Sequence, residues 1–482
     1  MNGSTVVRVI ALLWLIVAAF MIAPLLFGIA YGEADAVRGL LVSMGGIALV
    51  SGVVLVLVRP DPRPFVARQG YLLVSFGWLS VAALGAIPFV LGGAIPSYTD
   101  AFFETMSGFT TTGASILTDI ESLPKSLLFW RSLTHWLGGM GIVVLTVAVL
   151  PLLGVGGLQL IGAESPGPTV DKFAPKVAAT AKILWLIYLG LSVLQTLLLL
   201  LGGLDLFDAL THTFGTLATG GFSPRNTSVA AFDSVYVDVV ITVFMVAAGI
   251  NFALYYRLLT GRLSSLSRNT ELRVYLAVFV GASLLIAWDL QGSVAASFGE
   301  SLRYGSFQAA SILTTTGYAT ADFNAWPAIA RTALFALMFI GGSTGTPGGG
   351  IKVMRVVTLF KQGWNELNYL MQPRGVFSIR LNGQPVRKDI VYAISGFVAL
   401  YLFLLVVTTV VVATTGASLE TSLTTALATL GNIGPGLDAI GPTQNYAFFP
   451  GHIKWILSFV MMLGRLELYT VLVLFSRRFW RR

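Results

Sequence analysis

The residues best suited to chemistry in this chain are glycines and hydroxyl-bearing residues that recur in four short segments. Glycine adopts backbone angles that residues with a Cβ atom resist, so a turn built on it can direct consecutive carbonyl oxygens to one side. A ring of such oxygens can replace the hydration shell of a monovalent cation. The four segments, which align without gaps on one glycine each, are DAFFETMSGFTTTGAS (100–115), DALTHTFGTLATGGFS (208–223), YGSFQAASILTTTGYA (304–319) and TSLTTALATLGNIGPG (421–436).

The ion-coordinating residues are predicted to be each aligned glycine and the two residues before it. A threonine two positions before the glycine can add a hydroxyl oxygen, and the preceding half-helix would point its partly negative C-terminal end at the ion. Small residues recur six and twelve positions before each glycine, which would let these half-helices pack closely. The predicted potassium-filter residues are Thr111, Thr112, Gly113, Thr219, Gly220, Gly221, Thr315, Thr316, Gly317, Asn432, Ile433 and Gly434.

A second glycine-rich run, at 341–350, interrupts an apolar stretch that extends from 326 to about 360. Glycine and proline break helical hydrogen bonding, so we expect a loop at mid-membrane depth below the third segment. Such a loop could block an ion path and move aside; the alternative is a passive kink that lets helices approach. The predicted gate residues are Gly341, Gly342, Ser343, Thr344, Gly345, Thr346, Pro347, Gly348, Gly349 and Gly350.

Arg465 lies midway along the last apolar stretch. An arginine at the centre of a membrane helix costs about 2.5–3.5 kcal/mol on insertion scales, so it should face a cavity or a partner. We expect it to reach the pore below the filter, donate hydrogen bonds to the 341–350 loop and act with that loop as a gate. The alternative is an ion pair with Glu467 or a neighbouring carboxylate. Direct pairing with Glu467 is awkward, because residues two apart point to different helix faces.

The composition shows which elements must position these residues. Of 482 residues, 55% are hydrophobic and 11% are charged, whereas about 25% are charged in ordinary soluble domains. So little charge cannot coat a soluble fold, so the chain is predicted to be an integral membrane protein. The absence of cysteine and the presence of three histidines argue against thiolate, imidazole-metal and cofactor chemistry. The net charge of +8 fits the loops of a membrane protein, and nucleic acid is not an expected partner.

Ten apolar stretches are long enough to cross a bilayer, which needs about 20 residues. The alternative for the first stretch, 9–31, is a secretory signal peptide, but its apolar run is too long for the apolar region of such a peptide. Basic residues cluster at 59–68, 172–182, 257–273, 352–388 and 477–482, in loops on one side that the positive-inside rule makes cytoplasmic. Both termini are therefore expected in the cytoplasm. The ten stretches are 9–31, 38–58, 71–93, 127–153, 178–202, 234–259, 273–290, 326–360, 389–413 and 453–475.

The predicted fold is an all-α membrane protein with ten transmembrane helices. One span precedes and one follows each aligned segment, so the unit is span, pore helix, filter and span, repeated four times around a pseudo-fourfold axis. A single Gly-Thr turn could merely punctuate a helical bundle, but four copies on one side argue for a shared site. The expected divisions are 1–68 for an added N-terminal helix pair, then 69–170, 171–265, 266–386 (containing the 341–350 loop) and 387–482 for the four pore repeats.

On these residues the chain resembles the Trk/Ktr/HKT superfamily of cation transporters and, within it, the TrkH-type potassium uptake subunits. The resemblance rests on TTTGAS, ATGGFS, TTTGYA and GNIGPG together with GGSTGTPGGGIKVMR at 341–355. It implies potassium uptake across the inner (plasma) membrane, with one key glycine per repeat. It also implies a lipid-embedded homodimer and a separate cytoplasmic regulatory subunit of the nucleotide-binding RCK type. Pro347 departs from the small polar residue that is usual in this family.

Sodium-selective relatives carry serine at the first key glycine, so Gly113 favours potassium. A sodium-selective or sodium/potassium-coupled transporter remains the alternative. A hydrolase built on Ser343, in a GxSxG match, is a further alternative, but the only downstream histidine is His452. No enzymatic activity is expected. Two side predictions concern other polar residues: the acids Asp100, Glu104, Asp208 and Asp438 either make the outer vestibule electronegative or are ordinary solvated charges, and His135 and His212 pack and hydrogen-bond.

Overall fold

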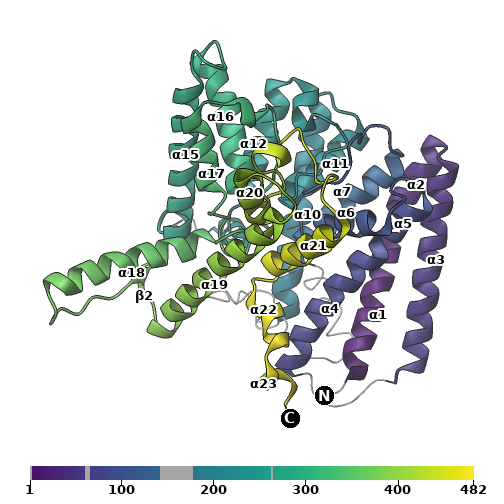
Figure 1. Ribbon diagram of the computed structural model, residues 1–482, viewed down its shortest axis with the longest axis horizontal. Coiled ribbons are helices and arrows are strands. Elements are labelled where there is room, and N and C mark those ends of the chain that lie inside the picture. Colours follow the sequence, from purple (N-terminus) through teal and green to yellow (C-terminus); the bar gives the residue numbers. More distant parts are fainter. Residues whose placement is uncertain (1–2, 60–65, 142–176, 262–263, 482) are drawn as a thin grey trace.

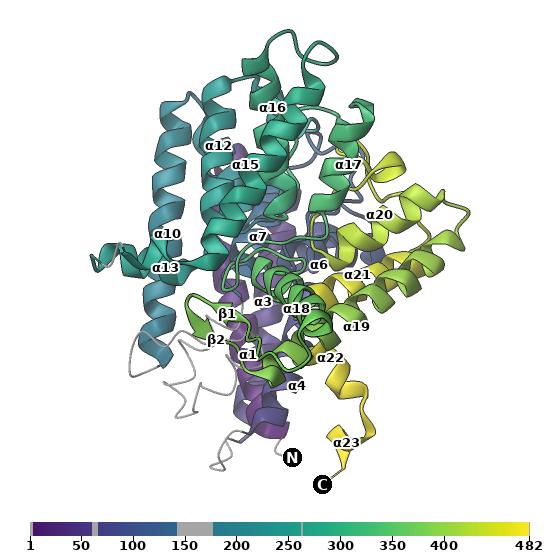
Figure 2. The same ribbon diagram turned by 90° about the vertical axis from the view of Figure 1, so that its left-hand side faces the viewer.

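The computed structural model describes residues 3–59, 66–141, 177–261 and 264–481, and these are mostly helical. The two short strands, β1 (Arg380–Leu381) and β2 (Gln384–Pro385), pair as a small antiparallel hairpin. The second half of the expected span 127–153 lies outside the described residues, as do Lys172 and Lys176. The first and last described residues lie at the same end of the molecule (Figures 1 and 2).

Among the described residues, six helical stretches are apolar and long enough to cross a membrane, or up to eight if each bent pair is one span. Two of the six are built from consecutive helices that the chain joins with little or no break: α1 (Gly3–Phe20) with α2 (Ile22–Tyr31), and α4 (Ala67–Gly85) with α5 (Ile87–Leu91). A third is the single helix α3 (Ala34–Leu57). The other three are α10 (Val177–Leu201), α15 (Thr270–Leu290) and α19 (Lys388–Ala413).

Two expected spans are broken rather than continuous. Helix α12 (Val235–Ala248) and α13 (Phe252–Leu259) meet at 95°, and α21 (Gly451–Arg465) turns by 111° into Tyr469–Phe475, which begins with α22 (Tyr469–Leu472). At the second break, Glu467 and Leu468 both have positive φ, which ends the helix. The expected spans 234–259 and 453–475 are therefore each formed by two helices with a bend between them, where Asn251 caps α13 and left-handed backbone ends α21.

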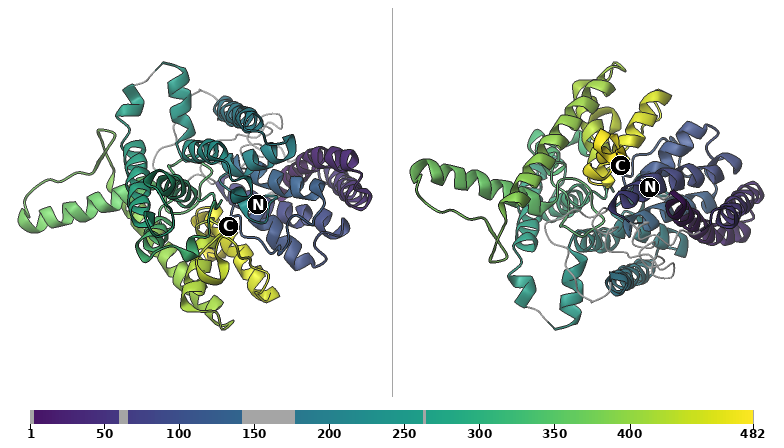
Figure 3. Two further views of the ribbon diagram at one scale, coloured as in Figure 1. Left: turned by 90° about the horizontal axis from the view of Figure 1, so that it is seen from above. Right: turned by 90° about the horizontal axis from the view of Figure 1, so that it is seen from below.

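The stretch 326–360 is also divided, as its glycine-rich centre predicts. Helix α17 (Ala328–Leu337) ends before the glycines, and α18 (Val353–Met371) begins after them. Helix α18 and the hairpin that follows it project sideways from the body of the molecule (Figures 1 and 3). Seen from above, successive parts of the chain follow one another around the centre, with the N-terminal helices and α18 on opposite sides (Figure 3).

Outward-facing side chains on the long helices are apolar. On α3, Val56 is 81% exposed, and on α19 Phe403 and Val406 are each more than half exposed. Exposing so many apolar side chains to water would be energetically unfavourable, whereas contact with lipid chains carries no such cost. Together with the helix lengths, these faces identify a multi-pass membrane protein.

Four shorter helices stand between the longer ones, and all begin in the same way. They are α6 (Tyr98–Phe109), α11 (Leu206–Leu217), α16 (Phe298–Leu313) and α20 (Leu419–Leu430). A side-chain oxygen of the residue before each helix accepts the N–H three positions later, and an acidic residue follows in the first turn. Such caps satisfy the free N–H groups and favour the positive end of the helix dipole. The capping residues are Ser97, Asp205, Ser297 and Ser418.

Candidate functional site: a ring of four turns

Each short helix ends in the same turn. The N–H one position before the aligned glycine donates to the carbonyl six positions before that glycine, and the distance is 2.8–2.9 Å in all four copies. A left-handed residue lies between, so the turn is a Schellman motif, which normally places glycine at the left-handed position. The four donor–acceptor pairs are Thr112–Ser107, Gly220–Gly215, Thr316–Ser311 and Ile433–Ala428.

The left-handed position of this turn is occupied by residues that resist it. Thr111, Thr219 and Thr315 have φ of 53°, 54° and 59°, and Asn432 has φ of 52°. Placing a residue with a Cβ atom in this backbone conformation costs on the order of 1–3 kcal/mol, and such strained residues are often found at functional sites. The aligned glycine two positions later also has positive φ, between 77° and 96°. The backbone therefore alternates in handedness through each turn.

The four turns close on one another. A Cβ atom added to Gly113 would lie 2.2 Å from the carbonyl oxygen of Gly220, in the next segment. The same relation recurs at the other three: Gly221 against the oxygen of Thr316 at 1.9 Å, Gly317 against that of Ile433 at 2.2 Å, and Gly434 against that of Thr112 at 2.6 Å. Each glycine thus touches the carbonyl that precedes the aligned glycine of the next segment, and the fourth returns to the first. Only glycine fits at these contacts.

One cavity of about 160 Å³ is lined by all four aligned glycines. Its wall also carries backbone and side chains that follow the glycines, including Phe222, Ser223 and Tyr446. No group of three acidic, histidine or cysteine side chains is placed to hold a metal ion in the described ranges. The oxygens in the four turns are those of the backbone, of the threonine hydroxyls and of the Asn432 side-chain amide.

In three of the four copies, a polar side chain of the short helix forms hydrogen bonds with the residues that follow the aligned glycine. His212 Nε2 lies 3.0 Å from the hydroxyl of Ser223, and Gln308 Nε2 donates to the Tyr318 carbonyl at 3.3 Å. In the first copy, Glu104 accepts from the Ser115 hydroxyl at 2.8 Å and from the Ile116 N–H at 2.9 Å. These three residues occupy the same place in their segments, nine positions before the glycine.

The predictions for three of the four acidic residues need correction. Glu104 is fully buried and forms an ion pair with Arg131, so it is neither a vestibule charge nor a solvated one. Asp208 is paired with Arg225, and Asp100 with Lys454 at 2.6 Å, so their charges are offset. Asp438 is exposed, as a solvated loop charge would be, and its carboxylate accepts the hydroxyls of Ser418 and Thr421, which hold its pKa below the ordinary value.

The two histidines lie against the ring. His212 also contacts the Asp208 carbonyl, at 2.8 Å, and His135 contacts the Gly108 carbonyl through Nδ1 at 2.7 Å. Both are fully buried, as packing and hydrogen bonding require. The His135 ring lies 2.5 Å from where a Cβ of Gly220 would be. This contact explains why the second segment has glycine where the others have threonine or isoleucine.

The 341–350 loop lies against the third and fourth turns. The Gly349 N–H donates to the Thr315 hydroxyl at 2.7 Å, and a Cβ on Gly349 would lie 2.1 Å from the Gly431 carbonyl oxygen. At its other end, the Ser343 N–H donates to the Gly249 carbonyl at 2.9 Å. The C-terminal ends of two short helices therefore face this loop, whose two ends meet where Gly341 donates to Ile351.

Arg465 donates to the Pro347 carbonyl of this loop and, at 2.5 Å, to the Gly138 carbonyl on α7 (Lys125–Gly139). The expected hydrogen bond to the loop is present. Glu467 forms an ion pair with Arg355. In the described part of the chain the buried Ser343 hydroxyl has no hydrogen-bond partner, so the Ser–His pair of a hydrolase does not form there.

Two charged residues make contacts with the loop that were not predicted from the sequence. Glu271 accepts the Thr344 N–H at 2.7 Å and its hydroxyl at 3.0 Å, and Lys352 donates to the Gly348 carbonyl. Their signal in the sequence was weak but present. Lys352 lies two positions after Gly350, the last glycine of the run, and Glu271 is an acid at the edge of an apolar stretch.

Comparison with known proteins agrees with this architecture along the whole chain. The model of the TrkH family, described as a cation transport protein, matches residues 42–482. The Trk system potassium uptake protein TrkH of Escherichia coli (strain K12) is 38% identical over 488 residues, covering 100% of both chains. TrkI of Halomonas elongata, also named a Trk system potassium uptake protein, is 36% identical over 99% of this chain and 97% of its own.

A solved structure is similar over its full length as well. The crystal structure of the potassium transporter TrkH from Vibrio parahaemolyticus matches with a TM-score of 0.89 at 33% identity, and 100% of both chains is covered. The matched region includes all four turns, the glycine-rich loop and Arg465. On sequence and on fold, the chain belongs to the TrkH family of cation transport proteins.

Proposed function

We propose that this protein takes up potassium through a channel-like pore whose selectivity filter is the ring of four turns. The observation that carries the proposal is the closed set of contacts from Gly113 to Gly220, Gly221 to Thr316, Gly317 to Ile433 and Gly434 to Thr112. A ring of backbone carbonyls suits a monovalent cation that has shed its water. The relatives are named as potassium uptake proteins of the Trk system, and glycine at 113 is consistent with potassium.

The gate in this proposal is the 341–350 loop together with Arg465. The loop's contacts with Thr315 and with the Gly431 carbonyl place it beside the ring, where it would obstruct an ion leaving the third and fourth turns. The Arg465 guanidinium adds a positive charge and tethers the loop at Pro347. Opening would require these hydrogen bonds to break and the loop to move aside.

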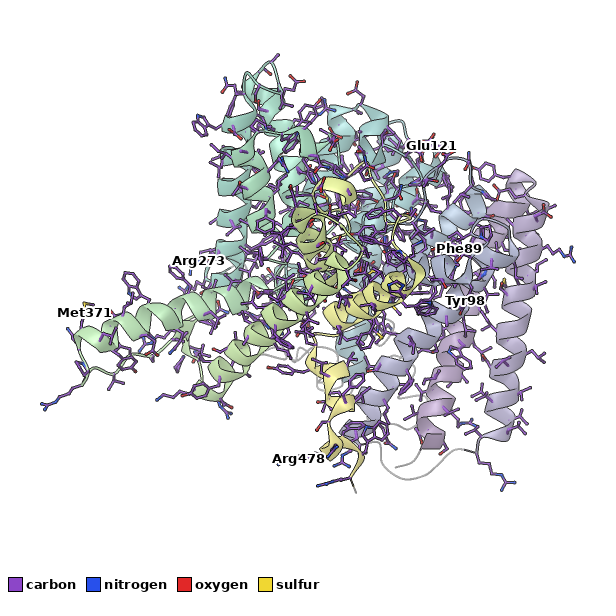
Figure 4. All side chains as sticks on the ribbon, in the orientation of Figure 1. Phe89, Tyr98, Glu121, Arg273, Met371 and Arg478 are labelled. Carbon is purple, nitrogen blue, oxygen red and sulfur yellow. The ribbon has the colours of Figure 1, made fainter. Side chains whose placement is uncertain are left out.

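The proposed assembly is a homodimer in the inner (plasma) membrane, with both termini in the cytoplasm and a separate RCK-type nucleotide-binding subunit on that side. The basic C-terminal end supports this orientation, since Arg478 lies at the end that holds both termini and Glu121 lies toward the opposite end (Figure 4). Exposed Trp364 and Leu370 on the projecting helix α18 support a protein contact there. The chain would divide at 68, 170, 265 and 386 into a helix pair and four pore repeats.

Flux in liposomes tests the filter. The purified protein, reconstituted with its regulatory subunit, is expected to carry potassium faster than sodium under opposing gradients. Gly113→Ser should lower the potassium-to-sodium flux ratio, because the added Cβ would meet the Gly220 carbonyl. Equal flux of the two ions in the wild type would leave a pore without potassium selectivity, and sodium-dependent potassium flux would favour the coupled alternative. Absence of flux with the subunit present would contradict the proposal.

A further inference from the structure

A buried ion pair lies behind the ring between the first and second turns. Glu104 on α6 is 0% exposed and Arg131 on α7 is 2% exposed, and Arg131 Nε donates to Glu104 Oε1 at 2.6 Å. Burying two charges is costly, and such a pair persists where further hydrogen bonds satisfy both partners. Each member here has such bonds, and they lead to different segments of the ring.

Glu104 holds the first segment. Its Oε1 accepts the hydroxyl of Ser115 at 2.8 Å, and its Oε2 accepts the N–H of Ile116 at 2.9 Å. These residues come two and three positions after Gly113. The carboxylate therefore fixes the backbone just where the chain leaves the first turn.

Arg131 holds the second segment at the matching place. Its Nη1 donates to the carbonyl of Ser223 at 2.9 Å, two positions after Gly221. Its guanidinium also stacks 3.5 Å above the ring of Phe222. A planar fork can serve Glu104 and Ser223 at once in fixed geometry, which the single ammonium of lysine cannot reproduce.

The other junctions between turns are joined differently. Between the second and third, the Tyr318 hydroxyl donates to the Phe222 carbonyl at 3.3 Å; between the fourth and first, the Tyr446 N–H donates to the Ser115 carbonyl at 2.7 Å. Between the third and fourth, Asn324 and the backbone of Asp438 exchange two bonds of 3.1 Å. These bonds to the segments that follow the aligned glycines use neutral donors, whereas the bonds at the first junction come from two opposite charges shielded from water.

We infer that Glu104 and Arg131 are positioning residues that fix the spacing between the first and second turns and thereby set ion selectivity. The inference rests on the proposed function of the ring as a filter. Neither side chain coordinates the ion in this account. They act through Ser115, Ile116 and Ser223, whose positions determine where the neighbouring carbonyls point.

The test compares potassium and sodium flux through Arg131→Lys in liposomes. Lysine keeps the charge but cannot hold both Glu104 and the Ser223 carbonyl, so we expect the potassium-to-sodium flux ratio to fall about tenfold. Potassium flux should continue, since the residues of the four turns are all kept. The matched control is Arg303→Lys, the same substitution in the ion pair between Arg303 on α16 and Asp238 on α12. The flux ratio of this variant should stay at the wild-type value.

A second variant covers the case in which a lone buried charge prevents folding. Glu104→Gln with Arg131→Met removes both charges together, and replacing a buried ion pair in this way is often tolerated. We expect a folded protein with a lowered flux ratio. A wild-type flux ratio in the double variant, with or without a change in its thermal unfolding, would overturn the inference and leave the filter proposal intact. Absence of selectivity in the wild type would instead contradict the proposed function.

Discussion

Gly221 shows how little space the ring leaves at each aligned glycine. A Cβ there would lie 1.9 Å from the Thr316 carbonyl oxygen, and its φ of 77° disfavours a side chain in any case. Gly221→Ala should therefore displace a carbonyl of the ring and abolish most potassium flux. We would measure flux in liposomes together with the elution profile of the purified protein.

The matched control is Gly190→Ala on α10, where an added Cβ would meet nothing within 4 Å. Alanine is favoured over glycine inside a helix by about 0.5–1 kcal/mol, so this variant should keep its flux and unfold at the same or a higher temperature. Undiminished flux and selectivity in Gly221→Ala would show that the contact with Thr316 does not shape the ion path.

Arg465 allows a test of the proposed gate. Arg465→Ala removes hydrogen bonds to the carbonyls of Pro347 and Gly138 and a positive charge beside the loop. A hydrogen bond from a charged group is worth about 1.5–3 kcal/mol, so we expect potassium flux to rise about tenfold or more. Arg387→Ala, at an exposed pair with Asp389, should leave flux unchanged. A folded Arg465→Ala protein with wild-type flux would remove Arg465 from the gate.

The N-terminus of helix α7 depends on a residue far from it in the sequence. Its N-cap, Pro124, offers no side-chain acceptor, and the Glu33 carboxylate accepts the N–H groups of Lys125 and Ser126 at 2.6 and 2.9 Å instead. Losing such a cap costs about 1 kcal/mol. We expect Glu33→Ala to lower the midpoint of thermal unfolding by about 2–4 °C.

The control for that variant is Glu366→Ala, since Glu366 bonds Gln362 on the surface of α18 and caps no helix. Its unfolding temperature should match the wild type. If Glu33→Ala also matches the wild type, the N-terminal helices contribute less to the stability of α7 than these hydrogen bonds indicate.

Features of this fold that depend on residue type and spacing could be predicted from the sequence, and features that depend on tertiary contacts could not. The four turns were predictable because glycine, threonine and small residues recur at fixed spacing, and the divided stretch 326–360 was predictable because glycine and proline break helices. The bend after Arg465 was not, since Leu468 at positive φ leaves no compositional signal. The Glu104–Arg131 pair was also missed, because the partners lie on different helices and only folding brings them together.

One chain forms all four turns of the ring, so the sequence of each turn can vary independently of the others. In a channel assembled from four identical subunits, any substitution appears four times around the axis. Here a change alters one quadrant alone, so the position before the aligned glycine can be threonine, glycine, threonine and isoleucine in turn. Backbone contacts keep the quadrants alike where they meet, while one quadrant has acquired a glycine-rich loop and another has acquired Arg465. A single chain can therefore change one turn of the ring without changing the other three, which a homotetramer cannot do.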